Sequence, residues 1–458
     1  MTNMTPITVE MSETMVLTYR VRLQPTKQHR RALESILEQQ RQLYNAALEE
    51  RIACYQKTGR TITDIDQSKS LTVIRADDQT FAVVQRRIQR ATLIRLQRAF
   101  QSFFKRVKAG AGASSGFPTF RAKVKTVGHM QLVNFGFEGF GFDAPQQIKF
   151  DGKRLHFAGM CGGLRVSKYD MRRVPTLTKE TWKGVHFKRT RTGWQATFQV
   201  VTPIAPRIGC GKGEVGVDWG TSVLAALSNG HIEPNTRPRE TMAKELLRHE
   251  RAVARSQKGS KRRLKDRWKK QGVEARIYNK RRDRFDKLSK RLVTENTLIA
   301  IEDIKVKDMM SAERPGETLP EFVKRRRNRE ALDAAPYKLR QMLEYKGRMK
   351  GARVIAVDPK DTTHECVWCG GKHYKELTDA VHTCTRPGPF FVRSEPRKVH
   401  AAKVILKRAL SEIAKGSDDT AGRGRAGGGK PPNGGNGRRR PRNTSAGSNA
   451  GADGSRSG

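Results

Sequence analysis

The sequence predicts an α+β protein of several domains, with a strand-rich N-terminal half, a mixed α/β half and a low-complexity tail. Apolar and polar residues alternate from Met15 to Leu23 and on both sides of Gly193, as they do in half-buried strands. Two apolar runs further along the chain each end on an acid, as buried strands that deliver a side chain to a site do. From Gly416 onward Gly, Pro, Asn, Ser and Arg dominate, and such a composition cannot bury a core.

The N-terminal half, residues 15–205, is expected to form a β-barrel with a helical segment inserted at about residues 26–110. Pro25-Thr26 starts a helix whose apolar residues recur at helical spacing, and a second, basic helix is expected from Phe81 to Val107. The first strand and the hairpin from Val185 to Val201 supply strands on either side of the insertion. Residues 1–14 and the tail, residues 416–458, are expected to be disordered.

The charge balance predicts a polyanionic partner. The chain has 458 residues, a formal net charge of +46 and 36% hydrophobic residues, and nucleic acid is the usual partner of so basic a protein. No apolar run approaches the length of a membrane-spanning helix, so no membrane partner is expected. Six cysteines without a secretion signal indicate a reducing compartment and favour metal ligation over disulfides.

Basic residues are densest between the two acidic strands. Residues 244–291 hold 20 Lys or Arg and 6 Asp or Glu, a balance of about +14. Such a run is often only a solvated pair of helices. Because it lies between two strands that end on acids, we interpret it as the wall of a nucleic-acid channel.

Two acids stand at the ends of predicted buried strands. Asp218 ends the run that begins at Glu214, and Glu302 ends the run that begins at Thr297. A carboxylate at the end of a buried strand is costly unless a cation neutralises it, and a divalent metal is a common partner. The two acids could hold Mg²⁺ for phosphodiester hydrolysis, or they could simply cap their strands.

Three motifs carry a resemblance to a known family. Gly-Val-Asp218-Trp-Gly, Ile-Glu302-Asp-Ile-Lys and Asp358-Pro-x-x-Thr-Thr-x-x-Cys366-x-x-Cys369-Gly occur in this order. In order and spacing they resemble the catalytic half of TnpB, the transposon-encoded, RNA-guided DNA nuclease related to type V CRISPR effectors. The likeness extends into the N-terminal half and spans roughly residues 15–410.

The resemblance implies a domain plan, partners and a cellular place. An RNase H-like domain of the RuvC type would comprise residues 206–362 and a last helix at 391–415, with a zinc-ribbon-like module at 363–390 between them. The N-terminal half would hold a guide RNA and bind a double-stranded DNA target, and Mg²⁺ at Asp218 and Glu302 would serve cleavage. The protein would work in the cytoplasm of a prokaryote.

The cysteines indicate a zinc site that departs from the four-cysteine pattern. Cys366 and Cys369 have the spacing that wraps two thiolates around one metal, and Cys384 follows fifteen positions later. No further cysteine stands two or three residues beyond Cys384. We therefore expect a zinc site of Cys366, Cys369, Cys384 and a histidine, His382 or else His373; a ribbon that folds without metal is the alternative.

The third catalytic acid of the resembled family is missing. The family pattern after the ribbon is Asp-x-Asn-Ala-Ala, and this chain has Lys398-Val-His400-Ala-Ala instead. A Lys ammonium repels a metal where the acid should bind it. Glu395, three residues upstream, is the replacement we predict for the third catalytic acid, provided that the local backbone shifts.

Two histories fit this departure. Either cleavage has been lost while guided binding was kept, or residues 385–400 are locally scrambled in an otherwise normal nuclease. Two other functions remain open: a transposase that joins DNA ends, and a nucleic-acid-binding protein that uses no guide.

Overall fold

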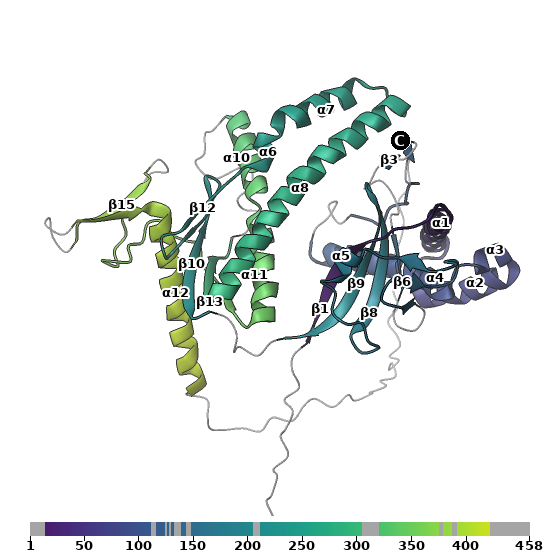
Figure 1. Ribbon diagram of the computed structural model, residues 1–458, viewed down its shortest axis with the longest axis horizontal. Coiled ribbons are helices and arrows are strands. Elements are labelled where there is room, and N and C mark those ends of the chain that lie inside the picture. Colours follow the sequence, from purple (N-terminus) through teal and green to yellow (C-terminus); the bar gives the residue numbers. More distant parts are fainter. Residues whose placement is uncertain are drawn as a thin grey trace, which may run out of the picture. The chain divides into compact units, whose positions relative to one another are not determined.

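The computed structural model describes most of the chain, which forms two compact units, residues 1–409 and 410–458. The described residues are 14–110, 116–123, 126–127, 130–131, 139–142, 148–204, 211–304, 320–374, 379–386 and 392–421 (Figure 1). The disorder expected of residues 1–14 and 416–458 falls on residues that lie mostly outside them, but Thr14 already belongs to the first strand. Residues 416–421 belong to a helix, so the tail does not start at Gly416 as predicted. None of the described helices is long and apolar enough to cross a lipid bilayer.

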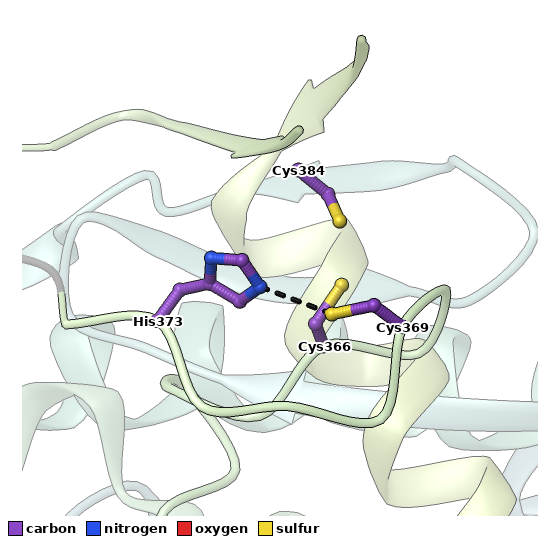
Figure 2. Close-up of side chains that lie close together, drawn as sticks. All are labelled: Cys366, Cys369, His373 and Cys384. Atoms are coloured by element: carbon purple, nitrogen blue, oxygen red, sulfur yellow. Dashed lines mark hydrogen bonds between the residues drawn. The ribbon is translucent and has the colours of Figure 1, made fainter. Parts of the chain in front are cut away.

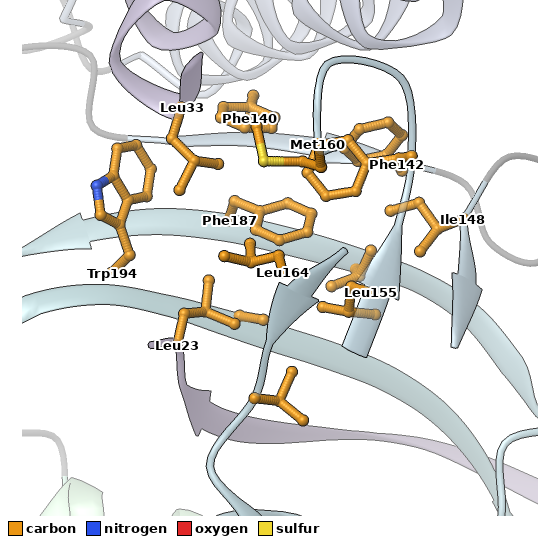
Figure 3. Packing of buried hydrophobic residues seen from close by; sticks show 14 of the residues in the cluster. Leu23, Leu33, Phe140, Phe142, Ile148, Leu155, Met160, Leu164, Phe187 and Trp194 are labelled. Carbon is orange, nitrogen blue, oxygen red and sulfur yellow. The ribbon is translucent and has the colours of Figure 1, made fainter. Parts of the chain in front are cut away.

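The first sheet is antiparallel and has the order β1-β9-β8-β4. Phe140, Phe187 and Trp194 of this sheet belong to a core that also contains Leu155 and Leu164 of a second, three-stranded sheet (Figure 3). The first sheet consists of β1 (Thr14–Arg22), β4 (Gly139–Phe142), β8 (Trp182–Thr190) and β9 (Gly193–Pro203), and the second of β5 (Lys149–Phe150), β6 (Arg154–His156) and β7 (Leu164–Arg165). A two-stranded pair, β2 (Thr126–Val127) and β3 (Met130–Gln131), and the short helix α5 (Lys168–Met171) complete this part.

The predicted β-barrel is not closed within the described residues. One isolated bridge, Leu23 to Val166, connects the two sheets, but β4 and β5, the outer strands, are not paired with each other. The sheets instead close their core by packing Phe142 against Phe157, with ring centroids 5.0 Å apart. Sequence alternation shows which face of a strand is buried, but it does not show which edges pair, and this explains the error.

Helices follow the first strand and build a small core of their own. Thr26 caps the first helix by accepting a hydrogen bond from the His29 N–H at 3.2 Å, and Gly59 ends it with a φ of 66°. Leu48, Leu71 and Leu96 are fully buried between the helices. The helices are α1 (Lys27–Thr58), α2 (Asp64–Asp77), α3 (Gln79–Ala82) and α4 (Arg86–Lys108). Of these, α2 was not expected from the sequence.

The second half contains a five-stranded mixed sheet of order β12-β11-β10-β13-β14. Strand β10 pairs antiparallel with β11 and parallel with β13, which in turn pairs parallel with β14. The strands are β10 (Gly213–Trp219), β11 (Val223–Leu227), β12 (Ile232–Pro234), β13 (Asn296–Glu302) and β14 (Arg353–Val357). The two acidic strands predicted from the sequence are therefore neighbours.

Helices cover both faces of this sheet. Val215 and Val217 of β10 pack against Phe285 and Leu339, from α8 and α11. Because side chains alternate along a strand, Gly216 and Asp218 lie on the opposite face, which α12 covers. The helices are α6 (Pro238–Thr241), α7 (Ala243–Arg255), α8 (Lys261–Glu295), α10 (Glu321–Ala334), α11 (Pro336–Lys350) and α12 (Arg397–Ala421).

Strand β10 and helix α12 pack in direct backbone contact. A Cβ added to Gly216 would collide with the carbonyl oxygen of Ala402. Ile405 and Ala409, further along the helix, join Ala300 and Val357 in a small buried cluster on the same face of the sheet. This close packing sets the register between the first turns of α12 and the strand that ends on Asp218.

Candidate functional site

The two predicted acids lie side by side at one end of the sheet. Strands β10 and β13 are parallel, and Val217 is paired with Ile301, so Asp218 and Glu302 follow at the same level. Both acids lie on the face that α12 covers. Parallel strands thus bring together two acids that are more than eighty positions apart in the sequence.

Burial makes both carboxyl groups hard to ionise. Burial is the main reason why the pKa of Asp218 is raised to about 7; the Lys398 charge opposes this rise, and the nearby Glu302 charge adds to it. The pKa of Glu302 is also raised by burial, although a hydrogen bond from Thr362 and the Lys398 charge act in the opposite direction. Such a pair needs a cation nearby, because desolvation disfavours the charged form of an acid.

Lys398 brings a positive charge to this pair. Lys398 lies one helical turn before Ala402, so both residues face strand β10. A Cβ added to Gly220, two residues after Asp218, would collide with the Lys398 ammonium. The packing of α12 therefore carries Lys398 to the end of the strand where the acids stand. This is the position at which the resembled family has its third acid.

The acid pair as it stands does not fit a two-metal site. Two carboxylates supply the oxygen ligands that Mg²⁺ prefers, but two ions held a few ångströms apart need more carboxylate ligands than two side chains provide. The Lys398 ammonium offers no lone pair and repels a cation. Among the described residues, this face therefore offers the predicted Mg²⁺ set of Asp218 and Glu302 no third carboxylate.

A loop after β14 positions Glu302. The Thr362 hydroxyl donates a hydrogen bond of 2.6 Å to Glu302 Oε1. Arg408 of α12 holds this loop by donating to the carbonyl oxygens of Asp358 at 2.8 Å and Lys360 at 2.7 Å. Sequence reasoning quoted the threonine only as part of a motif and missed its contact with the acid.

The cysteines converge in a separate cluster. Ligand atoms of Cys366, Cys369, His373 and Cys384 all lie within 4.8 Å of one another, and their side chains point toward a common centre (Figure 2). The turn between the first two is closed by a 2.9 Å hydrogen bond from the Gly370 N–H to the Cys366 carbonyl. Cys384 comes from strand β15 (Val381–Cys384), which pairs with β16 (Arg393–Pro396).

This cluster suits a soft divalent metal. His373 Nε2 lies 3.1 Å from Cys369 Sγ, and this contact lowers the pKa of Cys369 to about 6. Burial raises the pKa of Cys366. Three sulfurs and one imidazole nitrogen, close enough together to surround one ion tetrahedrally, are a ligand set typical of zinc. The fourth ligand-type atom in this group belongs to His373, the alternative considered from the sequence, and His382 lies outside the group.

His382 and Glu395 have other partners. His382 Nε2 lies 3.1 Å from Cys366 Sγ, and its ring stacks on that of His400 at 3.6 Å between centroids. Glu395 accepts a 2.7 Å hydrogen bond from His400 Nδ1 and is also paired with Lys403. Among the described interactions, none joins Glu395 to the acid pair, so its role as the third catalytic acid stays a prediction.

The chain thus contains an α/β sheet with an acid pair, followed by a cysteine–histidine module. Three family profiles match segments of the chain in order. A "Helix-turn-helix domain" of the OrfB_IS605 type matches residues 12–60, a "Probable transposase" profile of the same type matches 206–313, and a "Cas12f1-like, TNB domain" matches 337–405. The described residues of the first segment form strand β1 and helix α1 rather than two helices.

Two curated proteins are similar to this chain. One is "Putative RNA-guided DNA endonuclease InsQ" of Escherichia coli strain K12, 28% identical over 281 residues, which are 60% of this chain and 63% of that protein. The other, "Putative RNA-guided DNA endonuclease" of Streptomyces pristinaespiralis, is 26% identical over 403 residues, 87% of this chain and 90% of that protein. The chain thus spans less than two thirds of the E. coli relative. Together with the family profiles, these matches confirm the resemblance to TnpB-type proteins.

Two solved structures were also found to be similar. The protein of a Cas12f1–sgRNA–target DNA complex covers 86% of this chain and 99% of its own, with 12% identity and a TM-score of 0.47. That of a CRISPR–Cas12f ternary complex covers 82% of this chain and 80% of its own, with 14% identity and a TM-score of 0.29.

Proposed function

We propose that the protein is an RNA-guided DNA-binding protein of the TnpB type, with a RuvC-like domain whose DNA cleavage is impaired. The observation that carries this proposal is the placement of Lys398 against Gly220, beside Asp218 and Glu302. A third carboxylate there would add a negative charge and a metal ligand. Lysine adds a positive charge and no ligand, so divalent ions bind weakly and phosphodiester hydrolysis slows.

The hydrogen bonds of Glu395 support the proposal that DNA cleavage is impaired. Glu395 is the acid best placed in the sequence to replace the missing ligand, but its two oxygens accept from His400 and Lys403. To reach the acid pair it would have to leave both partners and strand β16, where it is paired with His382. Glu395 could therefore supply the third carboxylate only if these hydrogen bonds and this strand pairing were broken.

The proposed partners are a guide RNA and a double-stranded DNA target. The net charge of +46 supplies the attraction to phosphates, and the relatives in E. coli and Streptomyces are named putative RNA-guided DNA endonucleases. Residues 15–205 would hold the guide and read a short DNA motif. The basic helices α7 and α8 would line the channel for the guide–target duplex, which proteins recognise by shape and backbone.

The remaining domains follow the same proposal. Residues 206–362 and 391–415 would form the RuvC-like domain, and residues 363–390 the zinc-ribbon-like module. The pairing of β15 with β16 supports extending the module to Pro396. Helix α12, which starts at Arg397, would then join the module to the acid pair.

The proposal is tested by purifying the full chain with its own flanking transcript and sequencing the RNA that stays bound. The complex is then mixed with Mg²⁺ and a duplex that matches the RNA and carries a randomised flank. We expect an RNA of defined sequence and specific binding without efficient cutting. Binding of unrelated RNA and DNA alike would contradict the guided function, and efficient cutting would contradict the impairment.

A substitution at Lys398 separates these two parts. Lys398→Asp should restore or raise cleavage, because it replaces a positive charge by the missing carboxylate in the register set by Gly216 and Ala402. Lys415→Asp, at an exposed position of the same helix, is the matched control and should leave cleavage low. Guided binding with no gain in cleavage for Lys398→Asp would show that Lys398 is not the cause of the impairment.

A transposase is the second candidate function, because the profile over residues 206–313 is described as a probable transposase. A transposase would share the acidic metal chemistry but would join DNA ends. Incubation of the protein with transposon-end DNA and a target plasmid, without RNA, distinguishes the two. Strand-transfer products would contradict the proposal that the protein is an RNA-guided DNA-binding protein. Their absence, together with a bound guide RNA, would support it.

A further inference from the structure

A second group of metal-ligand atoms lies next to the first. Cys366, His382 and His400 are each fully buried, and one ligand atom from each lies within 4.8 Å of the other two. The His382 Nε2 atom is 3.1 Å from Cys366 Sγ, and the two imidazole rings stack with 3.6 Å between their centroids. Two stacked, buried imidazoles cannot easily both carry a charge, and neutral imidazoles present a nitrogen lone pair.

Glu395 orients His400 in the manner of a metal ligand. The Val367 N–H donates to His400 Nε2 at 3.1 Å, so the ring proton is on Nδ1, which donates to Glu395 Oε1 at 2.7 Å. A carboxylate that accepts from the second ring nitrogen is the usual companion of a metal-bound histidine. Lys403 holds the same carboxylate in place.

We propose that Cys366, His382 and His400 form a second metal position for a zinc-class divalent ion, with the Cys366 thiolate shared between the two positions. The first position is the one formed by Cys366, Cys369, His373 and Cys384. One thiolate and two imidazoles are ligands that suit Zn²⁺ and Co²⁺, and three protein ligands leave one tetrahedral place open. The proposal is independent of whether the protein binds a guide or cuts DNA.

The charges and hydrogen bonds around the second position are compatible with an ion. Three thiolates offset three of the four positive charges of two divalent cations, and the Glu395 carboxylate lies behind His400. On binding, His400 Nε2 would exchange the Val367 N–H for the metal. One backbone hydrogen bond contributes far less free energy than a bond to a structural zinc ion, so the exchange favours the metal.

The test counts ions in the full-length protein. After loading with Zn²⁺ and dialysis, metal analysis by mass spectrometry should find two ions per wild-type chain. His373→Ala should lose the ion of the first position, His400→Ala that of the second, and Cys366→Ser both. Loading with Co²⁺ adds a signature, because the ion with one thiolate gives a weaker sulfur-to-metal absorption than the ion with three.

A conservative variant keeps the test decisive if His400→Ala fails to fold. Glu395→Gln removes the charge behind His400 and should weaken the second ion about 10- to 100-fold while the first stays bound. Glu365→Gln, in the same module but paired with Arg408, is the matched control and should keep both ions. A single ion per wild-type chain that Glu395→Gln leaves unchanged would overturn the proposal, and His400 would then only hold the Val367 N–H.

Discussion

The acid pair and the cysteine module differ in which residue lies in place of a missing ligand. Both lack one residue of the resembled family's pattern, an acid in one and a cysteine in the other. At the acid pair, Lys398 stands where the acid should be. In the module, a ring nitrogen of His373 lies within 4.8 Å of three cysteine sulfurs. A site can keep its chemistry when another residue of the right kind reaches it.

The difference follows from how rigidly each site is built. The acids stand at the ends of paired strands, and α12 lies on β10 in backbone contact at Gly216, so the residue one turn before Ala402 faces them. The module is made of short turns and a small two-stranded sheet. His373, four positions after Cys369, lies 3.1 Å from its sulfur there. The following predictions test this contrast, from the largest expected effect to the smallest.

Removing a sulfur should disable the module most severely. Cys384→Ser replaces a soft ligand by a poor one in a fully buried place, so zinc affinity should fall by more than about 100-fold, since even outer-shell partners are worth about 10- to 100-fold. Competition with a fluorescent chelator measures this. Cys54→Ser, in helix α1, is the control and should bind zinc as the wild type does. Equal affinity for the Cys384 variant would remove it from the ligand set.

Removing the Asp218 charge should stabilise the protein, and the gain in stability should depend on pH. The pKa of Asp218 is about 7 in the folded state and 3.8 in the unfolded state. Between these values the folded state binds the extra proton, so wild-type stability falls as pH rises and the loss is complete above about pH 7. Asp218→Asn avoids this loss and should be more stable by roughly 2–4 kcal/mol at pH 8.

Urea unfolding in EDTA at pH 5 and pH 8 measures the effect of Asp218→Asn. The gain should be clearly smaller at pH 5, where the folded wild type still holds its proton. Asp303→Asn is the control, because that acid is half exposed and paired with Arg340; it should give no gain. A gain of equal size at both pH values would show that the Asp218 charge is not its cause.

Loss of the hydroxyl that supports Glu302 should have the smallest effect. Thr362 is 2% exposed and donates to Glu302 at 2.6 Å. Thr362→Val keeps the shape and removes the donor, so the pKa of Glu302 should rise further and the protein should lose about 1–2 kcal/mol of stability at neutral pH. Urea unfolding measures it. Thr297→Val, exposed at the other end of β13, should change stability by less than about 0.5 kcal/mol.

Local patterns sufficed for much of the fold. Alternation and apolar runs predicted β1, the β8–β9 hairpin, and β10 and β13 with acids at their ends, because a strand's buried face repeats every second residue. They could not show that the first sheet stays open within the described residues, since edge pairing depends on distant segments. Helix α2 was missed because its apolar residues are few and only Gln67 and Leu71 are buried.

The sequence by itself determined the resemblance to TnpB-type proteins, the basic character, the acids Asp218 and Glu302, and the presence of a cysteine–histidine module. These rest on residue identity and short spacing. Only the tertiary structure decided where Lys398 lies, which histidine joins the cysteines, and that Glu395 supports His400. The physical reason is that each of these contacts depends on how α12 and its neighbouring strands pack, and packing joins residues whose spacing in the chain carries no periodic signal.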